Sequence, residues 1–235
     1  ENKIKNAVKD AKTPNLDSIL STYPNTTIQP GGELVGLPKG VAGNSEVGHM
    51  NMGAGRPVRQ DLVRINEAIS MDTLKDMELM KTLISNAQKG SKRIHLMGLF
   101  SDGGVHSHIE HLKSILDILK TKDVKVYFHA FMDGRDTPRD NGIKYIKELE
   151  AHGGFSFASM QGRSIGMDRD RRWEKIKHAY DMMTGAGFKT NLSPSDFLES
   201  EYKKKIFDEF ISHVLFNDEA NIESNDSVFF INFRP

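Results

Sequence analysis

The sequence predicts an α/β fold with a largely parallel sheet, because compact apolar segments alternate with segments of helical periodicity along most of the chain. Each apolar segment has the length of one strand, and each is followed by apolar residues every three or four positions. Each apolar segment also ends in Gly, Asp, Arg or His. Ligands of open α/β sheets bind beyond the carboxyl ends of the strands. The same pattern therefore predicts a binding site.

The elements follow from this alternation in chain order. Strands are predicted over residues 94–100, 124–132, 155–160 and 227–233, because these runs are apolar and bounded by turn residues. Helices are predicted over residues 109–119, 143–149 and 173–183, where apolar residues recur at helical spacing. We expect the second helix to begin near Thr137-Pro138, because proline is favoured in a first helical turn.

Composition excludes several classes of function. Lysine plus arginine equals aspartate plus glutamate at 32 each, so no net field favours nucleic acid or a membrane surface. The absence of cysteine excludes disulfides and thiolate chemistry and fits a cytoplasmic protein. No apolar run reaches the roughly 18 residues of a membrane span, and the start is unlike a signal peptide. A soluble protein of one or two domains is expected.

Five polar residues follow the predicted strands and should converge at one edge of the sheet. They are His106, Arg135, Asp136, Arg163 and Arg234. Guanidinium groups pair bidentately with carboxylate or phosphate, and an imidazole can share a proton with phosphate. The sequence therefore predicts a pocket for a small dianion.

One serine, Ser45, lies in the glycine-rich segment 43–56. A hydrolase nucleophile elbow would need glycine where Val47 stands, and a P-loop would need a Gly-Lys-Ser/Thr ending. A dinucleotide fingerprint would need glycine in place of Val58. The pattern alone favours a turn with an incidental serine. A nucleophilic serine needs an activating base or metal, and none is evident nearby in the sequence.

Five ordered segments carry a resemblance to a known family. The segment GNSEVGHMNMGAGR at 43–56, followed by QDLVRIN, resembles the phosphoserine segment of the cofactor-independent phosphoglycerate mutases. The later segments SDGGVHSH (101–108), DGRD (133–136), MDRDRRW (167–173) and FFINFRP (229–235) are similar to signatures of the same family. The resemblance covers nearly the whole chain.

The resemblance implies an interconversion of 3-phosphoglycerate and 2-phosphoglycerate through a phosphoserine at Ser45. Trapped glycerate would be held by the arginines, and Arg169 joins the expected substrate ligands because it matches a family position. Asp136 is the carboxylate best suited to proton transfer at the glycerate hydroxyls. Two divalent metal ions, manganese in many relatives, would activate Ser45. Ser45 is the only one of the family's metal ligands in this chain.

The resemblance also implies a domain organisation. Residues 1–59 would form part of an alkaline-phosphatase-like domain, and residues 60–235 an inserted α/β transferase domain that is incomplete at its C-terminus. Relatives carry an earlier Asp-Gly metal-binding turn and later aspartates and histidines. We therefore expect an N-terminal half that is inactive alone, from a cytoplasmic, monomeric enzyme whose only partner is its small-molecule substrate. The predicted hinge lies near 61–67.

Other interpretations remain open. A different metal-dependent phosphatase-superfamily enzyme, such as a phosphopentomutase or a phosphomonoesterase, would share the serine chemistry. For the isolated chain, an inactive anion-binding domain is a more remote alternative. A histidine-nucleophile mutase is disfavoured, since no Arg-His-Gly segment exists. Several residues near the motifs are given structural or solvent-exposed roles: Asp102 and Asp133 in turns, His108 and His111 on a helix surface, and Arg171 and Arg172 in solvent. A supporting contact from His49 to the serine loop is left open.

Overall fold

A computed structural model describes residues 6–234. Residues 1–5, within the first predicted domain, and Pro235, the last residue of the FFINFRP motif, lie outside the described residues. The chain divides into two compact units, Glu1–Val58 and Arg59–Pro235. Each unit is described by itself.

The first unit is helical over its described residues. Its elements are α1 (Ala7–Asp10), α2 (Pro14–Thr22), the 3₁₀ turn η1 (Glu33–Val35) and α3 (Ser45–Ala54). Asn44 caps α3, because its side chain accepts a hydrogen bond from the Val47 amide at 3.0 Å. Asn51 connects α3 to its surroundings, since it donates to the Val35 carbonyl at 3.1 Å and accepts from the Val58 amide at 2.7 Å. These contacts fix the segment that carries Ser45.

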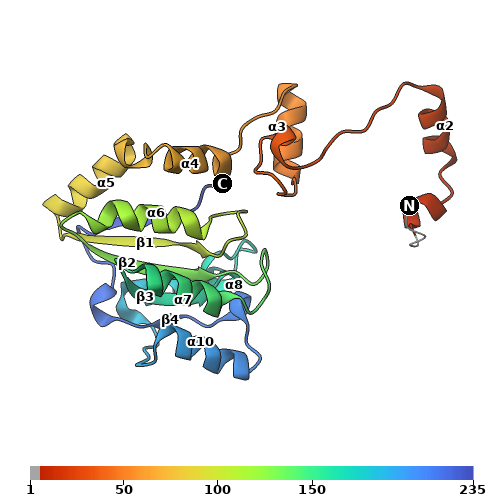
Figure 1. The fold of residues 1–235 in the computed structure, drawn as a ribbon. Helices are drawn as coiled ribbons and strands as arrows, with labels where there is room; N and C mark the ends of the chain where they lie inside the picture. Colours follow the sequence, from red (N-terminus) through yellow and green to blue (C-terminus); the bar gives the residue numbers. More distant parts are fainter. Residues whose placement is uncertain (1–5, 235) are drawn as a thin grey trace. The chain divides into compact units, whose positions relative to one another are not determined.

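The second unit is built on a five-stranded sheet (Figure 1). The strands are β1 (Arg93–Phe100), β2 (Lys125–Met132), β3 (Ser156–Gly162), β4 (Val214–Leu215) and β5 (Ser227–Phe230). Their order is β4-β3-β2-β1-β5, and only β4 runs antiparallel to its neighbour. The prediction of an α/β fold with a largely parallel sheet is confirmed.

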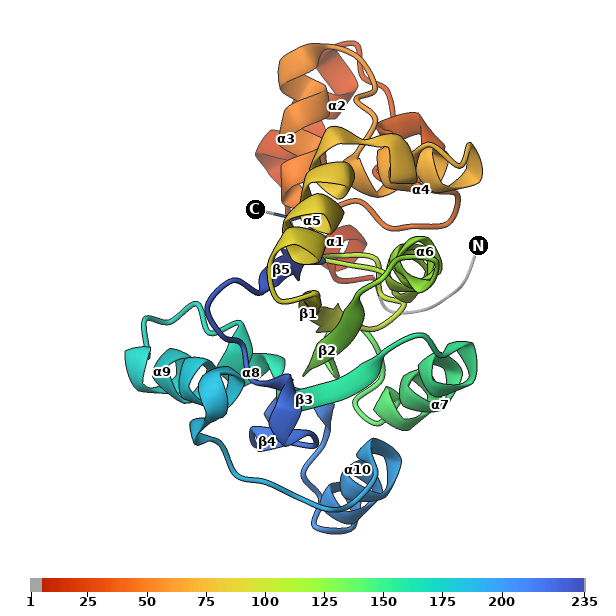
Figure 2. The ribbon, with the colours of Figure 1, turned by 90° about the vertical axis from the view of Figure 1, so that its left-hand side faces the viewer.

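Helices cover both faces of this sheet. Three helical elements precede β1: α4 (Asp61–Ser70), η2 (Leu74–Asp76) and α5 (Glu78–Lys89). Three later helices lie along one face of the sheet: α6 (Ile109–Lys120), α7 (Gly142–His152) and α10 (Pro194–Lys203). The remaining elements are α8 (Arg163–Gly166), α9 (Trp173–Asp181), the π-helical turn η3 (Met182–Ala186), η4 (Asp208–Phe210) and η5 (Asp218–Ala220). Figure 2 shows α6 and α7 on one side of the strands and α8 and α9 on the other. None of the described helices is both long and apolar enough to cross a membrane.

The core lies between the sheet and the helices α5, α6, α7 and α10. Leu96, Phe128 and Leu116 are almost completely buried there, and α6 is amphipathic with its apolar stripe facing the strands. Burying such side chains supplies most of the stabilisation, at roughly 25 cal/mol for each Å² of apolar surface removed from water. The core therefore holds the strand ends in place.

The strand register sets the geometry of the site. Phe100 pairs with Met132, and Met132 pairs with Gly162. Three adjacent parallel strands thus end at the same level, although β2 and β3 shift register once along their length. The next residue after each of these strand ends faces the same edge of the sheet.

Some element boundaries differ from the prediction. The helix expected near Thr137-Pro138 begins only at Gly142, because residues 138–141 form a turn in which the Asn141 amide donates to the Pro138 carbonyl at 3.2 Å. The last strand ends at Phe230 rather than Phe233. Beyond it the Phe233 amide bonds to the His106 carbonyl at 2.9 Å, so the chain follows the loop after β1. Helix α10 and strand β4 were not predicted.

Candidate functional site

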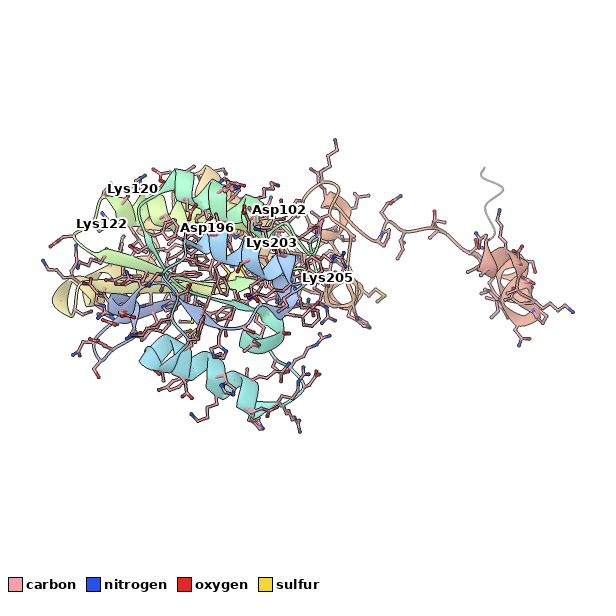
Figure 3. The ribbon with its side chains drawn as sticks, turned by 90° about the horizontal axis from the view of Figure 1, so that it is seen from below. Asp102, Lys120, Lys122, Asp196, Lys203 and Lys205 are labelled. Carbon is pink, nitrogen blue, oxygen red and sulfur yellow. The ribbon has the colours of Figure 1, made fainter. Side chains whose placement is uncertain are left out.

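A basic pocket of about 430 Å³ lies at the carboxyl edge of the sheet in the second unit. Figure 3 shows Asp102, the second residue after β1, toward the opposite end of this unit from Lys120 and Lys122. Six basic and three acidic side chains line the pocket. The basic ones are Arg135, Arg163, Arg169, Arg172, Lys175 and Arg234. The pocket therefore carries an excess of positive charge in a protein whose total charge is zero.

The structure brings together most of the site residues expected from the sequence. His106, Arg135, Arg163, Arg169 and Arg234 all line the basic pocket. Asp136 contacts Arg163 at its edge. These residues come from four segments, which follow β1, β2, β3 and β5. The strand-end pattern in the sequence located all of them except Arg169, which was expected from the family resemblance.

Arg163 is held by three neighbouring side chains. Its Nη1 donates to Asp133 Oδ1 and to Asp136 Oδ2, each at 2.7 Å, and its Nη2 lies 3.2 Å from His106 Nε2. Burial acts to lower the pKa of Arg163, but the hydrogen bonds to Asp136 and Asp133 outweigh it and raise the pKa. The guanidinium is therefore permanently charged and held in one orientation.

His106 is held between this arginine and the end of the chain. Its carbonyl accepts a hydrogen bond from the Phe233 amide at 2.9 Å. This bond holds the segment that places Arg234 in the pocket lining. Burial lowers the pKa of the His106 imidazole, and the charges of Arg163 and Arg234 lower it further. His106 is therefore neutral near pH 7 and can offer one N–H to a ligand.

Two arginines present their guanidinium groups to the pocket without a protein partner. Arg135 and Arg169 are exposed, and neither guanidinium has a hydrogen bond or ion pair within residues 6–234. Asp168 shapes the loop that carries Arg169, since its Oδ2 accepts the amides of Asp170 and Arg172 at 3.1 and 2.9 Å. An anion entering the pocket would meet two unneutralised cations.

Ser45 lies in the first unit, at the first residue of α3, and is exposed. Gly43, two residues before Ser45, lets the chain approach Pro30 closely, because a Cβ on Gly43 would lie 1.7 Å from the Pro30 carbonyl oxygen. His49 Nδ1 lies 2.6 Å from the Ser45 carbonyl oxygen and 3.2 Å from Ser45 Oγ. A carbonyl only accepts, so we assign the proton to His49 Nδ1. That nitrogen supports the serine turn and has no free lone pair with which to deprotonate Ser45.

The residues around Ser45 do not form a complete metal site. Within residues 6–234 no group of three or more His, Asp or Glu side chains lies close enough to hold a metal ion. The Ser45 hydroxyl can supply one oxygen ligand, so this chain offers part of a donor set.

One assignment made from the sequence is wrong, one is incomplete, and two pocket residues were missed. His111, expected on a helix surface, is 2% exposed and its Nε2 lies 2.7 Å from Asn66 Oδ1. Arg172 is exposed, as expected, but it also lines the pocket and pairs with Asp168, its Nε lying 2.6 Å from Oδ1. Lys175 and Glu209 also line the pocket and were missed. No sequence motif marks them. Lys175 reaches the pocket from the start of α9, and Glu209 reaches it from the 3₁₀ turn η4.

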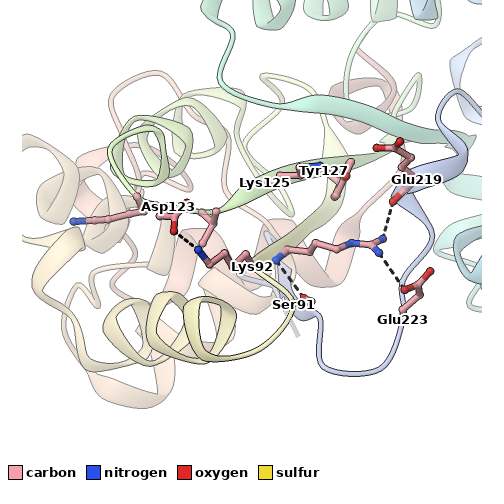
Figure 4. A pocket seen from close by; sticks show the side chains of 10 residues that line it. Ser91, Lys92, Asp123, Lys125, Tyr127, Glu219 and Glu223 are labelled. Atoms are coloured by element: carbon pink, nitrogen blue, oxygen red, sulfur yellow. Dashed lines mark hydrogen bonds and ion pairs between the residues drawn. The ribbon is translucent and has the colours of Figure 1, made fainter.

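A larger hollow of about 640 Å³ lies at the opposite, amino-terminal edge of the sheet (Figure 4). Two of its cations are already neutralised. Lys92 pairs with Asp123, and Arg93 contacts Glu223 at 3.2 Å and donates to the Glu219 carbonyl at 2.8 Å. The basic pocket at the carboxyl edge is lined by five arginines and one lysine, against one arginine and three lysines in this hollow. Because guanidinium groups pair bidentately with carboxylate and phosphate, the basic pocket is the better anion site.

The fold and the pocket define an α/β domain with an arginine-rich pocket, suited to a small anion, at the carboxyl ends of its strands. Residues 65–235 match the family described as BPG-independent PGAM N-terminus (iPGM_N). The chain thus belongs to the family of 2,3-bisphosphoglycerate-independent phosphoglycerate mutases.

Individual relatives agree with this membership. The 2,3-bisphosphoglycerate-independent phosphoglycerate mutase of Picosynechococcus sp. is 45% identical over 235 residues, covering 98% of this chain and 45% of the relative. That of Clostridioides difficile is 47% identical over 240 residues, covering 98% of this chain and 46% of the relative. A crystal structure of Leishmania mexicana phosphoglycerate mutase at low cobalt concentration is 30% identical, with a TM-score of 0.82 over 95% of this chain and 44% of that one. The chain thus spans a little under half the length of these relatives.

Proposed function

We propose that this chain carries the nucleophile and the glycerate pocket of a metal-dependent phosphoglycerate mutase. The enzyme would interconvert 3-phosphoglycerate and 2-phosphoglycerate without bisphosphoglycerate. The observation that carries the proposal is the pair of unneutralised guanidinium groups, Arg135 and Arg169, beside the fixed cation Arg163 in one pocket. The names of the relatives support the same reaction.

The pocket suits phosphoglycerate because that substrate carries a carboxylate and a phosphate. Arg135, Arg169 and Arg234 can each pair with carboxylate or phosphate oxygens through two parallel hydrogen bonds. The neutral His106 offers an additional N–H from Nδ1. A ligand held at several points keeps its reacting groups positioned, which lowers the entropic part of the barrier.

The chain's own groups would then take the following parts in transfer. The Ser45 oxygen forms a bond to phosphorus while the bond from phosphorus to the glycerate oxygen breaks, and the Ser45 proton is released. Asp136, at the edge of the basic pocket, relays a proton from solvent to the departing glycerate oxygen and later takes one from the other hydroxyl and returns it to solvent. Glycerate retained by the arginines takes the phosphoryl group back on that second oxygen.

A divalent metal at the Ser45 hydroxyl would lower its pKa and neutralise phosphoryl charge. We propose two such ions, manganese as the preferred metal, with Ser45 as a ligand of one of them. The start of α3 adds a favourable environment for a phosphoryl group on Ser45, because helix N-termini attract anions. His49 is occupied by the Ser45 carbonyl, which supports a metal rather than a base as the activator.

The test is conversion of 3-phosphoglycerate to 2-phosphoglycerate by the full-length protein, without bisphosphoglycerate and with added manganese. We expect activity that a chelator and Ser45→Ala both abolish, while phosphoglycerate binding survives Ser45→Ala. A panel with phosphopentoses and simple phosphomonoesters runs in parallel. Turnover of those substrates alone would replace the mutase assignment with another phosphatase-superfamily activity.

We also propose that the 235-residue chain alone binds phosphoglycerate without converting it. The chain spans 45% of the length of the Picosynechococcus relative, which supports this expectation. Calorimetry measures the binding and the mutase assay measures turnover. Metal-dependent turnover by the 235-residue chain would overturn the expectation.

A further inference from the structure

Asp133 is a buried carboxylate behind the basic pocket, 1% exposed and absent from the pocket lining. Both of its oxygens are engaged. Oδ2 accepts the Ser101 hydroxyl at 2.6 Å. Oδ1 accepts the Arg135 amide at 3.1 Å, the Asp136 amide at 3.0 Å and Arg163 Nη1 at 2.7 Å. One residue therefore contacts three strand-end loops.

This placement follows from the strand register. Ser101, Asp133 and Arg163 each directly follow the last residue of β1, β2 and β3, and those last residues pair with one another. A carboxylate at the central strand end can therefore reach a neighbour on either side. Because Asp133 is buried, its charge is stable only while these hydrogen bonds are made.

The orientation of Arg163 depends on this contact. Its two Nη1 hydrogens point to Asp133 and Asp136, and one Nη2 hydrogen points to His106. The second Nη2 hydrogen and the Nε hydrogen remain for a ligand. Without Asp133 the guanidinium would keep one carboxylate partner and gain rotational freedom, which a ligand would have to remove on binding.

We propose that Asp133 is a positioning residue for the phosphoglycerate pocket: it fixes the direction of the Arg163 guanidinium and the turn that carries Arg135 and Asp136. The inference rests on the proposed function. Asp133 acts through Arg163 and does not contact the ligand.

The two possible roles of Asp133 predict opposite changes in phosphoglycerate affinity when its charge is removed, so one experiment separates them. Asp133→Asn keeps the shape and an oxygen acceptor for the turn amides, and the Ser101 hydroxyl can accept from the new amide. If Asp133 were only a nearby negative charge, its removal would make the pocket more positive and would tighten anion binding. If it positions Arg163, removal weakens binding. We expect KM for 3-phosphoglycerate to rise roughly 10-fold, the effect of weakening one charged hydrogen bond.

The experiment is a double-mutant cycle in the full-length protein with Asp133→Asn, Arg163→Gln and the double variant. Asp102→Asn is the matched control, because Asp102 follows the neighbouring strand β1 but contacts Tyr145, with Oδ1 2.6 Å from its hydroxyl. We expect the double variant to resemble Arg163→Gln within about 2-fold, since residues that act through one another are not additive. Unchanged or lower KM in Asp133→Asn, or losses that multiply in the double variant, would overturn the proposal.

A second measurement does not depend on the substrate. In protein labelled with ¹⁵N-arginine, the Arg163 side-chain signals report rotation of the guanidinium in the free state. We expect restricted rotation in the wild type and in Asp102→Asn, and faster rotation in Asp133→Asn, because a neutral amide oxygen holds the guanidinium more weakly than a carboxylate does. Equal rotation in wild type and Asp133→Asn would refute the positioning role. The wild-type protein could show restricted rotation that Asp133→Asn releases, and yet fail to bind 3-phosphoglycerate. In that case the proposed function fails while the role of Asp133 stands.

Discussion

Arg163 Nη2 lies 3.2 Å from His106 Nε2, and this distance fixes the state of the imidazole. A guanidinium can only donate hydrogen bonds, so His106 Nε2 has to accept and the ring proton is assigned to Nδ1. Burial, Arg163 and Arg234 all lower the pKa of His106. The pocket therefore combines permanent arginine charges with one neutral histidine donor.

The first prediction concerns the titration of His106. Its pKa should lie below the ordinary value of about 6.5, because burial and two adjacent cations disfavour the protonated ring. Arg163→Gln should raise that pKa by removing one of the cations. NMR titration of the histidine ring protons measures both. A pKa above 6.5 in the wild type would contradict the assigned contact.

The second prediction compares two arginines of the same loop. Arg169→Gln should weaken binding of 3-phosphoglycerate by roughly 10-fold to 100-fold, because its guanidinium has no partner within the described residues and can face a ligand. Arg171→Gln removes the same charge two residues away, from an exposed side chain outside the pocket lining. It should change affinity less than about 2-fold. Calorimetry on both variants decides, and equal losses would mean that only overall charge matters.

The third prediction uses the close approach at the end of β3. A Cβ on Gly162 would lie 2.2 Å from the Glu209 carbonyl oxygen, which is backbone and cannot simply rotate away. The turn that holds Glu209 and Phe210 lines the pocket, and Gly162→Ala should displace it. The substitution should also destabilise the fold by about 1–3 kcal/mol. Urea unfolding measures the loss. An unchanged unfolding midpoint would show that the turn relaxes freely.

The fourth prediction is a loss of stability on mild acidification. Burial lowers the pKa of His111 to about 4 and that of His129 to about 3, where His95 adds to the effect. The unfolded chain, with histidine pKa values of about 6.5, binds more protons than the folded chain below neutral pH. The stabilisation is therefore complete well above pH 6.5, begins to fall as the histidines of the unfolded chain protonate around pH 6.5, and keeps falling toward pH 4 and then 3.

One buried group opposes this trend. Burial raises the pKa of Asp208 to about 6, so the folded state gains protons there between about pH 6 and 4. We expect the urea midpoint to fall most clearly between pH 7.5 and 6, where the histidines act largely alone. His111→Asn should flatten this dependence. A midpoint that rises on acidification over that range would contradict the expectation.

How much the sequence predicted follows from which forces set each feature. Strands β1, β2 and β3 were predictable because their apolar runs are buried on both faces, and the polar residues directly after them necessarily share one edge. The burial of His111 was not predictable, since it depends on Asn66 from a different helix, 45 positions away. Strand β4 has two residues and owes its existence to pairing with Ser159 and Met160, so it carries no pattern of its own.

The proposed phosphoserine can be tested by finding the phosphoryl group in transit. Full-length protein would be mixed with 3-phosphoglycerate and manganese, quenched early in turnover, digested and analysed by mass spectrometry. We predict a phosphate on the peptide that contains Ser45, absent in Ser45→Ala and chased away by added glycerate. Turnover with phosphate on a histidine, or with no phosphorylated residue in the Ser45 peptide, would contradict it.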